Sequence, residues 1–293
     1  MTVGQLEQFL YERYPKANQC RWDNTGLMCG DPAAEVDRVL FALDITDAVI
    51  AQAEQLGAQV IVAHHPLIRE GLKQVTPQSD ARVWRLCKAG IAAISMHTNL
   101  DISVGGVGDA LAAAVGLRNP QPIFAVEEQE DLMFGRVGDV KETAPEDFCG
   151  VVKAALDTPF VRAVCGNRPI RRVAVMGGSG RDYIEEAAKA ADAYVTADCR
   201  YHDFQLAQRL GLTLIDAGHF PTENVVMEPL MQAVGSAFPV LELYRAEHTD
   251  VIRIFYRRTI CPLTEFFSRR FVAPLSLPLG RRWTRCISRR RPS

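Results

Sequence analysis

Two stretches of the 293-residue chain repeat one order of elements, and this repeat constrains the fold more than any other feature. In each stretch a short apolar strand leads into a helix, a second strand, another helix and a third strand. The expected strands are 38–44, 58–63 and 90–97 in the first stretch, and 172–176, 193–198 and 211–219 in the second. This alternation is typical of β-α-β units with buried, largely parallel strands. We therefore predict an α/β fold of two related halves that face each other across one site.

The repeat also sets the predicted boundaries along the chain. Residues 1–118 form the first half, 119–168 a connecting segment with one helix at 145–156, and 169–255 the second half. The remaining residues, 256–293, differ in composition, because from Arg257 onward they hold ten arginines, no lysine and one acid, a formal charge of +9. We interpret them as a disordered basic extension, with a contact for nucleic acid or lipid and a frameshifted end as alternatives.

Charge and hydropathy exclude several classes of protein. The whole chain carries −2, which leaves −11 for residues 1–256, and an acidic body argues against nucleic-acid binding. No apolar run approaches the ~18 residues that span a bilayer, and residues 1–14 lack the features of a secretory signal. Eight cysteines are scattered without a C-x-x-C pair. We expect reduced thiols and a cytoplasmic location.

Histidines and acids gather where the predicted strands end. Five of the six histidines lie at or just after such ends, and they are His64, His65, His97, His202 and His219. The acids that accompany them are Asp101, Asp198, Asp203 and Glu223. Ligand-binding residues of open α/β sheets lie beyond the carboxyl ends of the strands. Imidazole and carboxylate without thiolate suit divalent Zn, Fe, Mn, Co or Ni.

The number of candidate ligands favours two ions over one. Two histidines from one strand end, an aspartate, a further histidine and a glutamate make five ligands, which suits two ions that share a bridge. Each group also has a structural alternative. The pair His64-His65 can be ordinary strand-end residues, and Asp101 can cap the following helix. Glu223 can sit in the first turn of a helix running to Val234, where the helix dipole favours an acid.

Two further motifs have competing interpretations. Asn24 lies in the turn Trp22-Asp-Asn-Thr-Gly26, where it is an Asx-turn residue unless its loop covers the site. The run Gly177-Gly-Ser-Gly180 between a strand and a helix can cradle a phosphate on backbone N–H groups. It lacks the lysine and the hydroxyl residue of a P-loop, which favours use as a tight turn.

Taken together, these segments resemble the NIF3-like (DUF34) family, whose bacterial members are labelled GTP cyclohydrolase 1 type 2 homologues. The matching segments are Trp22–Leu27, His64–Lys73, Met96–Asp101, Gly177–Gly180, Thr196–Asp203 with Ala197 in place of an expected glycine, and Gly218-His219 with Glu223. The resemblance runs in order to about Phe255, and the chain is similar to the short members that lack an inserted middle domain.

The resemblance implies a NIF3-like fold, two divalent metal ions per subunit and a ring-shaped homohexamer built as a trimer of dimers. Carried over position by position, the metal ligands are His64, His65, Asp101, His219 and Glu223, with Glu223 as the bridge. The catalytic candidates are then His97 and His202, as substrate-contacting residues or as a general base, and Asp203 can orient His202.

The expected function is a dinuclear metal-dependent hydrolase that acts on a small nucleotide or heterocyclic amide-like substrate. The family label points to opening of the guanine ring of GTP. One alternative is a metal-binding, ring-shaped assembly protein that contacts proteins or single-stranded nucleic acid. Another is a nucleotide phosphoesterase, which releases phosphate where ring opening releases formate.

Overall fold

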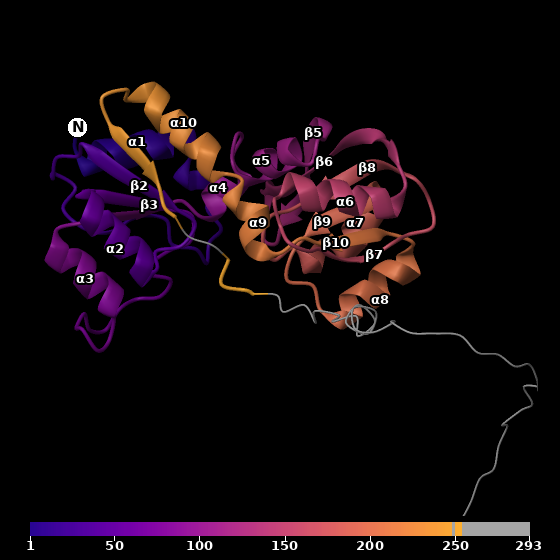
Figure 1. The fold of residues 1–293 in the computed structure, drawn as a ribbon, viewed down its shortest axis with the longest axis horizontal. Coiled ribbons are helices and arrows are strands. Elements are labelled where there is room, and N and C mark those ends of the chain that lie inside the picture. Colours follow the sequence, from indigo (N-terminus) through magenta and orange to yellow (C-terminus); the bar gives the residue numbers. More distant parts are fainter. Residues whose placement is uncertain (248–249, 254–293) are drawn as a thin grey trace, which may run out of the picture. The chain divides into compact units, whose positions relative to one another are not determined.

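The structure is a computed structural model that describes residues 1–247 and 250–253, and residues 1–252 form one compact unit. The predicted extension, 256–293, lies outside the described residues. The unit is a mixed α/β fold with two sheets, as predicted (Figure 1). Among the described residues, no helix combines the length and the apolar character needed to span a bilayer.

The first sheet has five strands. Their order across the sheet is β1 (Gly26–Cys29), β4 (Ala92–Ser95), β3 (Val60–Ala63), β2 (Arg38–Ala42) and β11 (Glu242–Arg245). All neighbours pair in parallel except β1, which is antiparallel to β4. The helices packed with this sheet are α1 (Val3–Arg13), α2 (Asp47–Leu56), α3 (Ala81–Ala89) and α10 (Met227–Ala237), and a 3-10 turn spans Lys16–Asn18.

The second sheet has six strands. Their order is β5 (Arg118–Val126), β6 (Gln129–Thr143), β8 (Ile170–Val175), β9 (Ala193–Thr196), β10 (Thr213–Asp216) and β7 (Arg162–Val164). The central strands β8, β9 and β10 are parallel, and the outer strands are antiparallel to their neighbours. The other helical elements are α4 (Thr98–Ile102), α5 (Val107–Ala114), α6 (Pro145–Ala155), a 3-10 turn (Arg181–Tyr183), α7 (Ile184–Ala190), α8 (Tyr201–Leu210) and α9 (His219–Asn224).

The central strands are rich in apolar residues because their side chains are buried on both faces of the sheet. In β2, Val39 and Phe41 point into a core shared with α1 and α10, whereas Leu40 and Ala42 point into a second core shared with α2 and α3. Successive side chains of a strand lie on opposite faces, so a strand covered on both sides reads as one continuous apolar run. The strands of the second sheet are divided between two further cores in the same way.

Capping residues set the first turns of α2 and α3, and a glycine ends each helix shortly before the next strand. The hydroxyl of Thr46 caps the first turn of α2, and Gly57 ends that helix with φ +63°. Asp80 and Gly90, with φ +67°, do the same for α3. Because only glycine adopts positive φ at little cost, the chain can turn there directly into β3 and β4.

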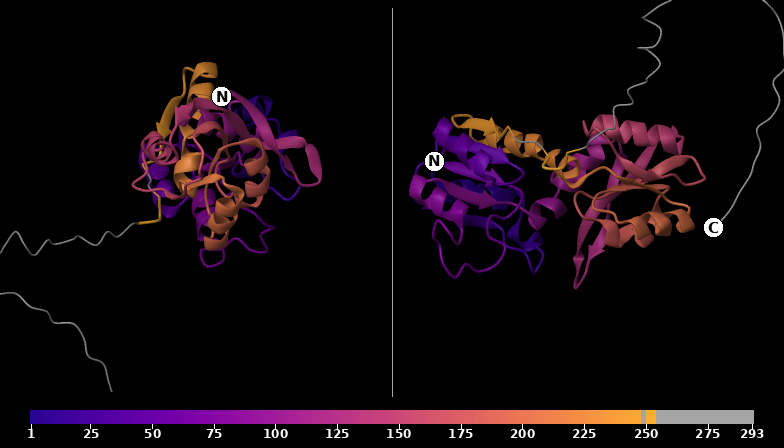
Figure 2. Two further views of the ribbon diagram at one scale, coloured as in Figure 1. Left: turned by 90° about the vertical axis from the view of Figure 1, so that its right-hand side faces the viewer. Right: turned by 60° about the horizontal axis from the view of Figure 1, so that its bottom comes forward.

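After the second sheet is complete, the chain returns to the first sheet. After α9, helix α10 packs into the core beside β2, and β11 pairs in parallel with β2; both are drawn in orange among the N-terminal elements in Figures 1 and 2. In the connecting segment, the predicted helix is present as α6, and the hairpin of β5 and β6 joins the second sheet. The residue boundaries of the two halves stay predictions.

Candidate metal centre

The end of β3 brings His64 and His65 to one point. Both backbone N–H groups continue the strand's bonding, to the carbonyls of Ala42 and Leu43. The two rings lie 4.9 Å apart between centroids and are tilted by 46°. Their Nε2 atoms lie 3.7 Å and 2.9 Å from Oε2 of Glu223. The side chains therefore converge, although neighbours on a regular strand point to opposite faces.

The end of β4 supplies His97 and Asp101. His97 is the residue before α4, and Asp101 lies within that short helix, with Oδ1 3.6 Å from Nε2 of His64. The alternative that Asp101 caps the following helix is wrong. Helix α5 begins after Gly106 without a side-chain cap, and it is Asp109 that accepts a bond from the nearby N–H of Gly105.

The segment after β10 supplies His219 and Glu223. The two residues are one helical turn apart in α9, so they share a face, and Nε2 of His219 lies 3.0 Å from Oε2 of Glu223. A single helix continuing to Val234 was expected here, but the helix breaks before α10 starts at Met227. Glu223 consequently lies in the last turn of α9, and a helix dipole does not account for its presence.

Glu223 is the centre of this arrangement. Glu223 is only 5% exposed. Its Oε2 faces the Nε2 atoms of three histidines, two that follow a strand of the first sheet and one that follows a strand of the second. Neither Oε2 of Glu223 nor Nε2 of His64 has a hydrogen-bond partner of acceptable geometry. Buried polar atoms that are close together but not hydrogen-bonded are costly unless a cation joins them. The geometry of these atoms fits a metal site.

In the four clustered histidines, His64, His65, His97 and His219, the ring nitrogen Nδ1 on the side opposite Nε2 is hydrogen-bonded to an acceptor. Each Nδ1 donates one hydrogen bond, from His64 to the carbonyl of Met96 (2.9 Å), from His65 to Asp44 (2.7 Å), from His97 to Asp23 (2.7 Å) and from His219 to Asp198 (2.8 Å). This pattern fixes the tautomer and directs Nε2 toward the cluster, as it does for metal-bound histidines. The roles of Asp23 and Asp44 were not predicted from the sequence, although Asp44 lies two residues past the end of β2.

Nearby carboxylates shift the pKa values of His65 and His219 upward. Burial lowers the pKa of His65, but Asp44 and Glu223 outweigh burial and raise its pKa to about 10. Burial likewise lowers the pKa of His219, and Glu223 with Asp198 raises it to about 9. Burial disfavours the charged form of Glu223, yet the facing histidines hold the pKa of this carboxyl well below its ordinary range.

Asp101 shifts in the other direction. Burial raises the pKa of this carboxyl to about 7, and the attraction of His64 offsets only part of the effect, while the negative charge of Glu223 adds to it. Two carboxylates that both approach His64 therefore repel each other in this low-dielectric region. A divalent cation between them would remove that repulsion, which is a second respect in which the residues fit a metal.

Three overlapping donor groups occur among the described residues. In each group the ligand atoms lie within 4.8 Å of one another, and the groups are His65 with His219 and Glu223, His64 with Asp101 and Glu223, and His64 with His65 and His97. Histidine and carboxylate donors without cysteine fit the divalent ions expected from the sequence.

His202 and Asp203 are placed elsewhere. His202 is exposed in α8 and donates from Nδ1 to the side chain of Gln205, so the structure does not bring it into these groups. The expectation that Asp203 orients His202 is wrong, because Asp203 accepts a hydrogen bond from the backbone N–H of Arg200.

The glycine-rich turn after β8 packs against Glu223. Gly178 has φ +60°, and a Cβ at this position would lie 2.1 Å from Oε1 of Glu223. Its N–H donates to Thr222, and the N–H of Gly180 donates to Thr196. These amides are used within the protein, which supports the tight-turn interpretation over a phosphate cradle. Glycine is needed here because the backbone closely approaches the carboxylate.

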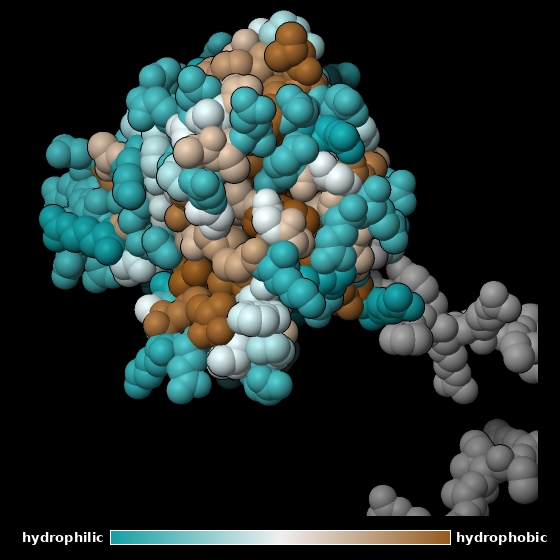
Figure 3. All heavy atoms as spheres, turned by 90° about the vertical axis from the view of Figure 1, so that its left-hand side faces the viewer, coloured by the Kyte–Doolittle hydropathy of each residue, from teal (hydrophilic) through white to brown (hydrophobic). Residues whose placement is uncertain are grey.

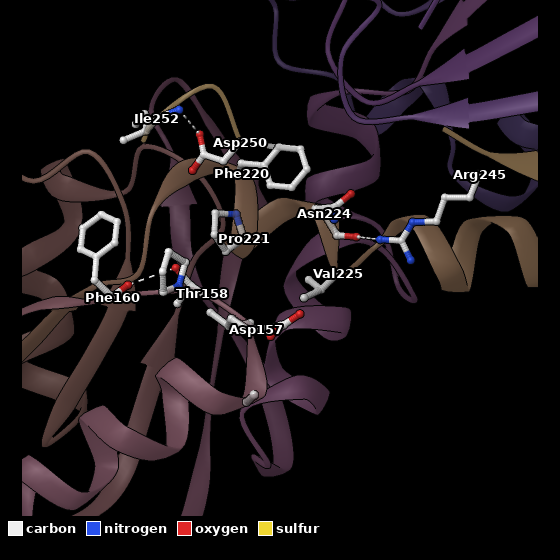
Figure 4. A pocket seen from close by; sticks show the side chains of 13 residues that line it. Asp157, Thr158, Phe160, Phe220, Pro221, Asn224, Val225, Arg245, Asp250 and Ile252 are labelled. Atoms are coloured by element: carbon white, nitrogen blue, oxygen red, sulfur yellow. Dashed lines mark hydrogen bonds between the residues drawn. The ribbon is translucent and has the colours of Figure 1, made fainter. Parts of the chain in front are cut away.

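Two cavities flank α9. One, of about 690 Å³, is lined by His65 and His219. The other, of about 520 Å³, is lined by Phe220, Pro221 and Asn224, whose backbone carbonyl accepts a hydrogen bond from Arg245 (Figure 4). The second cavity holds none of the clustered donors, so the candidate site is placed at the first.

These features define a two-sheet α/β protein with a candidate metal centre built from residues of both sheets. The family described as Duf34/NIF3 (NGG1p interacting factor 3) matches residues 1–250, and the chain belongs to this family. A relative from Nostoc sp. named "GTP cyclohydrolase 1 type 2 homolog" is 38% identical over 69% of this chain and 79% of its own length. A relative of the same name from Lactococcus lactis is 35% identical over 72% of this chain and 83% of its own length.

A solved structure supports the same relationship. The Staphylococcus aureus hypothetical protein SA1388 superposes with a TM-score of 0.80 and 29% identity, covering 87% of this chain and 99% of that chain. The family predicted from the sequence segments is therefore confirmed.

Proposed function

We propose that this chain is a hydrolase that uses two divalent metal ions per subunit, with Glu223 as their bridging ligand. The position of Oε2 of Glu223 carries the proposal, because this one carboxylate belongs to two donor groups at once. A shared carboxylate is how two-ion hydrolytic sites commonly hold their pair. The proposed ligands are His64, His65, Asp101, His219 and Glu223.

The residues present suit the work that such a site requires. When bound, the ions would activate water and polarise the bond under attack. The ring of His97 is anchored through Nδ1 to Asp23, so its other nitrogen is available to exchange a proton with a group at the site. Asp44 and Asp198 hold His65 and His219 in the orientation that presents Nε2 to the centre.

The cavity beside His65 and His219 supports a small-molecule substrate. Its volume of about 690 Å³ falls in the usual range for ligand pockets, roughly 300–1,000 Å³. The relatives' name refers to GTP, and we extend that chemistry to this chain as hydrolytic opening of a nucleotide's heterocyclic ring with release of formate. Release of phosphate in place of formate would indicate a phosphoesterase.

An assembly role is the second candidate, and exposed apolar side chains favour it. Large apolar residues with at least 40% exposure include Leu72, Val104, Val151, Leu210 and Val240. Figure 3 shows apolar side chains gathered in patches on one face of the molecule, and such patches mark contact sites. The homohexamer belongs to this proposal, and so does a cytoplasmic location, which the free state of the six described cysteines favours.

Elemental analysis of anaerobically purified protein tests the metal assignment. We expect about two divalent ions per subunit in the wild type. The double variant His65→Ala with Glu223→Ala is expected to lose the metal while keeping its oligomeric mass, because the core strands are untouched. His202→Ala is the matched control and is expected to keep its metal. Full metal content in the double variant would contradict the ligand assignment. A formate and phosphate assay across nucleotides and cyclic amides then identifies the reaction.

A further inference from the structure

We propose that the indole of Trp22 is the surface on which the planar heteroaromatic part of the substrate stacks, next to His97. This inference rests on the proposed hydrolase and adds the residue that selects for an aromatic ring in its substrate. It concerns the sequence Trp22-Asp-Asn-Thr-Gly26, whose role the metal ligands do not account for.

The indole is exposed at the border of the candidate metal centre. Trp22 is 71% exposed, although large aromatic residues are usually mostly buried. Its ring lies 6.1 Å from the ring of His97 between centroids, and the two planes are inclined by 76°. The ring of His97 lies 5.2 Å from that of His64 and 5.7 Å from that of His65. The exposed indole is thus separated from the proposed ligands by one imidazole. It does not line the cavity beside His65 and His219, so a ring stacked on it would extend from the metal ligands past His97, outside that cavity.

The backbone that carries the indole is held firmly by the next residue. The carboxylate of Asp23, whose side chain is 2% exposed, accepts hydrogen bonds from Nδ1 of His97 (2.7 Å), from the N–H of Thr98 (3.0 Å) and from the hydroxyl of Thr98 (2.5 Å). The same carboxylate therefore fixes the loop, the start of α4 and the orientation of His97. A ring bound on Trp22 would have a constant position relative to the metal ligands.

Further contacts hold the loop on both sides of Trp22. The N–H of Arg21 donates to the side chain of Gln129 at the start of β6 (2.8 Å). The side chain of Asn24 donates to the carbonyl of Ile68 in the segment after β3 (2.8 Å). The hydrogen bonds of the described residues include none to Oδ1 of Asn24, so they give no support to the Asx-turn interpretation. A loop tied to two distant segments loses little conformational freedom when a ligand binds, which favours recognition.

The geometry suits a heterocyclic ring better than an aliphatic ligand. An exposed indole offers a flat π-face, on which a base or a similar heterocycle stacks irrespective of its substituents. A ring that lies parallel to the indole is steeply inclined to the imidazole plane of His97, so a polar ring edge can approach the imidazole. Trp84, 41% exposed on α3, makes no ring contact with the histidine cluster among the described residues, so it serves as the control.

Calorimetric titration of the full chain with guanosine tests the proposal, with ribose 5-phosphate as a probe that lacks the aromatic ring. Metal content is measured on each sample. Trp22→Ala is expected to weaken guanosine binding about tenfold or more, the size of one base–aromatic stack. Trp22→Phe keeps an aromatic face and is expected to stay within about threefold of the wild type. Trp84→Ala is expected to bind guanosine as the wild type does, and no variant should change the response to ribose 5-phosphate.

Three results would overturn the inference. The first is that Trp22→Ala binds guanosine as tightly as the wild type does, and the second is that the wild type does not bind guanosine. The third is a changed oligomeric mass of Trp22→Ala in light scattering, which would place the indole at a contact between copies. Failure of the proposed function is distinguishable from these results. If guanosine binding depends on Trp22 but the protein contains no metal and shows no hydrolytic activity, the stacking role is upheld and the proposed hydrolase function is refuted.

Discussion

Replacing Gly178 by alanine tests whether the position of Glu223 determines metal binding. The added Cβ would lie 2.1 Å from Oε1 of Glu223, whereas ordinary van der Waals contact begins at 3.4 Å. The carboxylate must therefore move by about 1.3 Å, the difference between these two distances. Metal–ligand distances tolerate deviations of only about 0.2 Å. We expect Gly178→Ala to lose most of its bound metal.

We expect Gly178→Ala to lose most of its metal but to show only a modest decrease in the free energy of unfolding. Alanine at φ +60° costs roughly 1–2 kcal/mol because of its left-handed conformation. Gly90 is the matched control, since it has φ +67° and a Cβ there would meet nothing within 4 Å. Both variants should show a similar conformational cost in the free energy of unfolding. Only Gly178→Ala should also lose metal.

Elemental analysis and urea unfolding of the two variants, in chelator-treated and untreated samples, give the comparison. Full metal content in a folded Gly178→Ala protein would refute the reasoning. Equal metal loss in Gly90→Ala would also refute it, because the loss would then follow from backbone strain at any left-handed glycine.

Two further predictions concern the acids that hold the histidines. Asp198→Asn removes the anionic acceptor of His219 Nδ1, and we expect metal affinity about 10- to 100-fold lower in a chelator competition assay; unchanged affinity would contradict the assigned role. For Asp23, burial raises the pKa, but the bonds from His97 and Thr98 lower it to about 2, below its ordinary 3.8. The wild type is therefore expected to have a larger free energy of unfolding than Asp23→Asn above about pH 4, and this difference should be lost as the pH falls toward 2. A difference in urea unfolding that does not change with pH would contradict this expectation.

Part of the convergence of the candidate ligands could be foreseen from sheet topology. His64 and His65 follow β3, Asp101 comes shortly after β4, and His219 follows β10. The carboxyl ends of parallel strands lie at one edge of a sheet, so His64, His65 and Asp101 come together at the edge of the first sheet. His219 follows a strand of the second sheet, and its approach to the other three was expected from the repeat of the two halves and from the family resemblance. Apolar runs and helix caps were enough to locate these strands.

Other features could not be foreseen because they depend on tertiary contacts. The break between α9 and α10 falls at Val225-Val226, two residues that carry no glycine or proline signal. His202 was expected at a strand end, but β9 ends at Thr196, which places His202 in α8. The roles of Asp23 and Asp44 are set by their partners in space, and an acid in a loop has no periodic pattern that reveals such a partner.

The pairing of β11 with β2 has a consequence for how the chain is made. Ribosomes release the N-terminal residues first, and domains tend to fold as their segments emerge. The edge of β2 that pairs with β11 must wait until Glu242–Arg245 has been synthesised. Until then a nascent chain exposes an unpaired strand edge, a known template for aggregation. Truncation before β11 should therefore yield insoluble protein even though all the proposed metal ligands have already been translated.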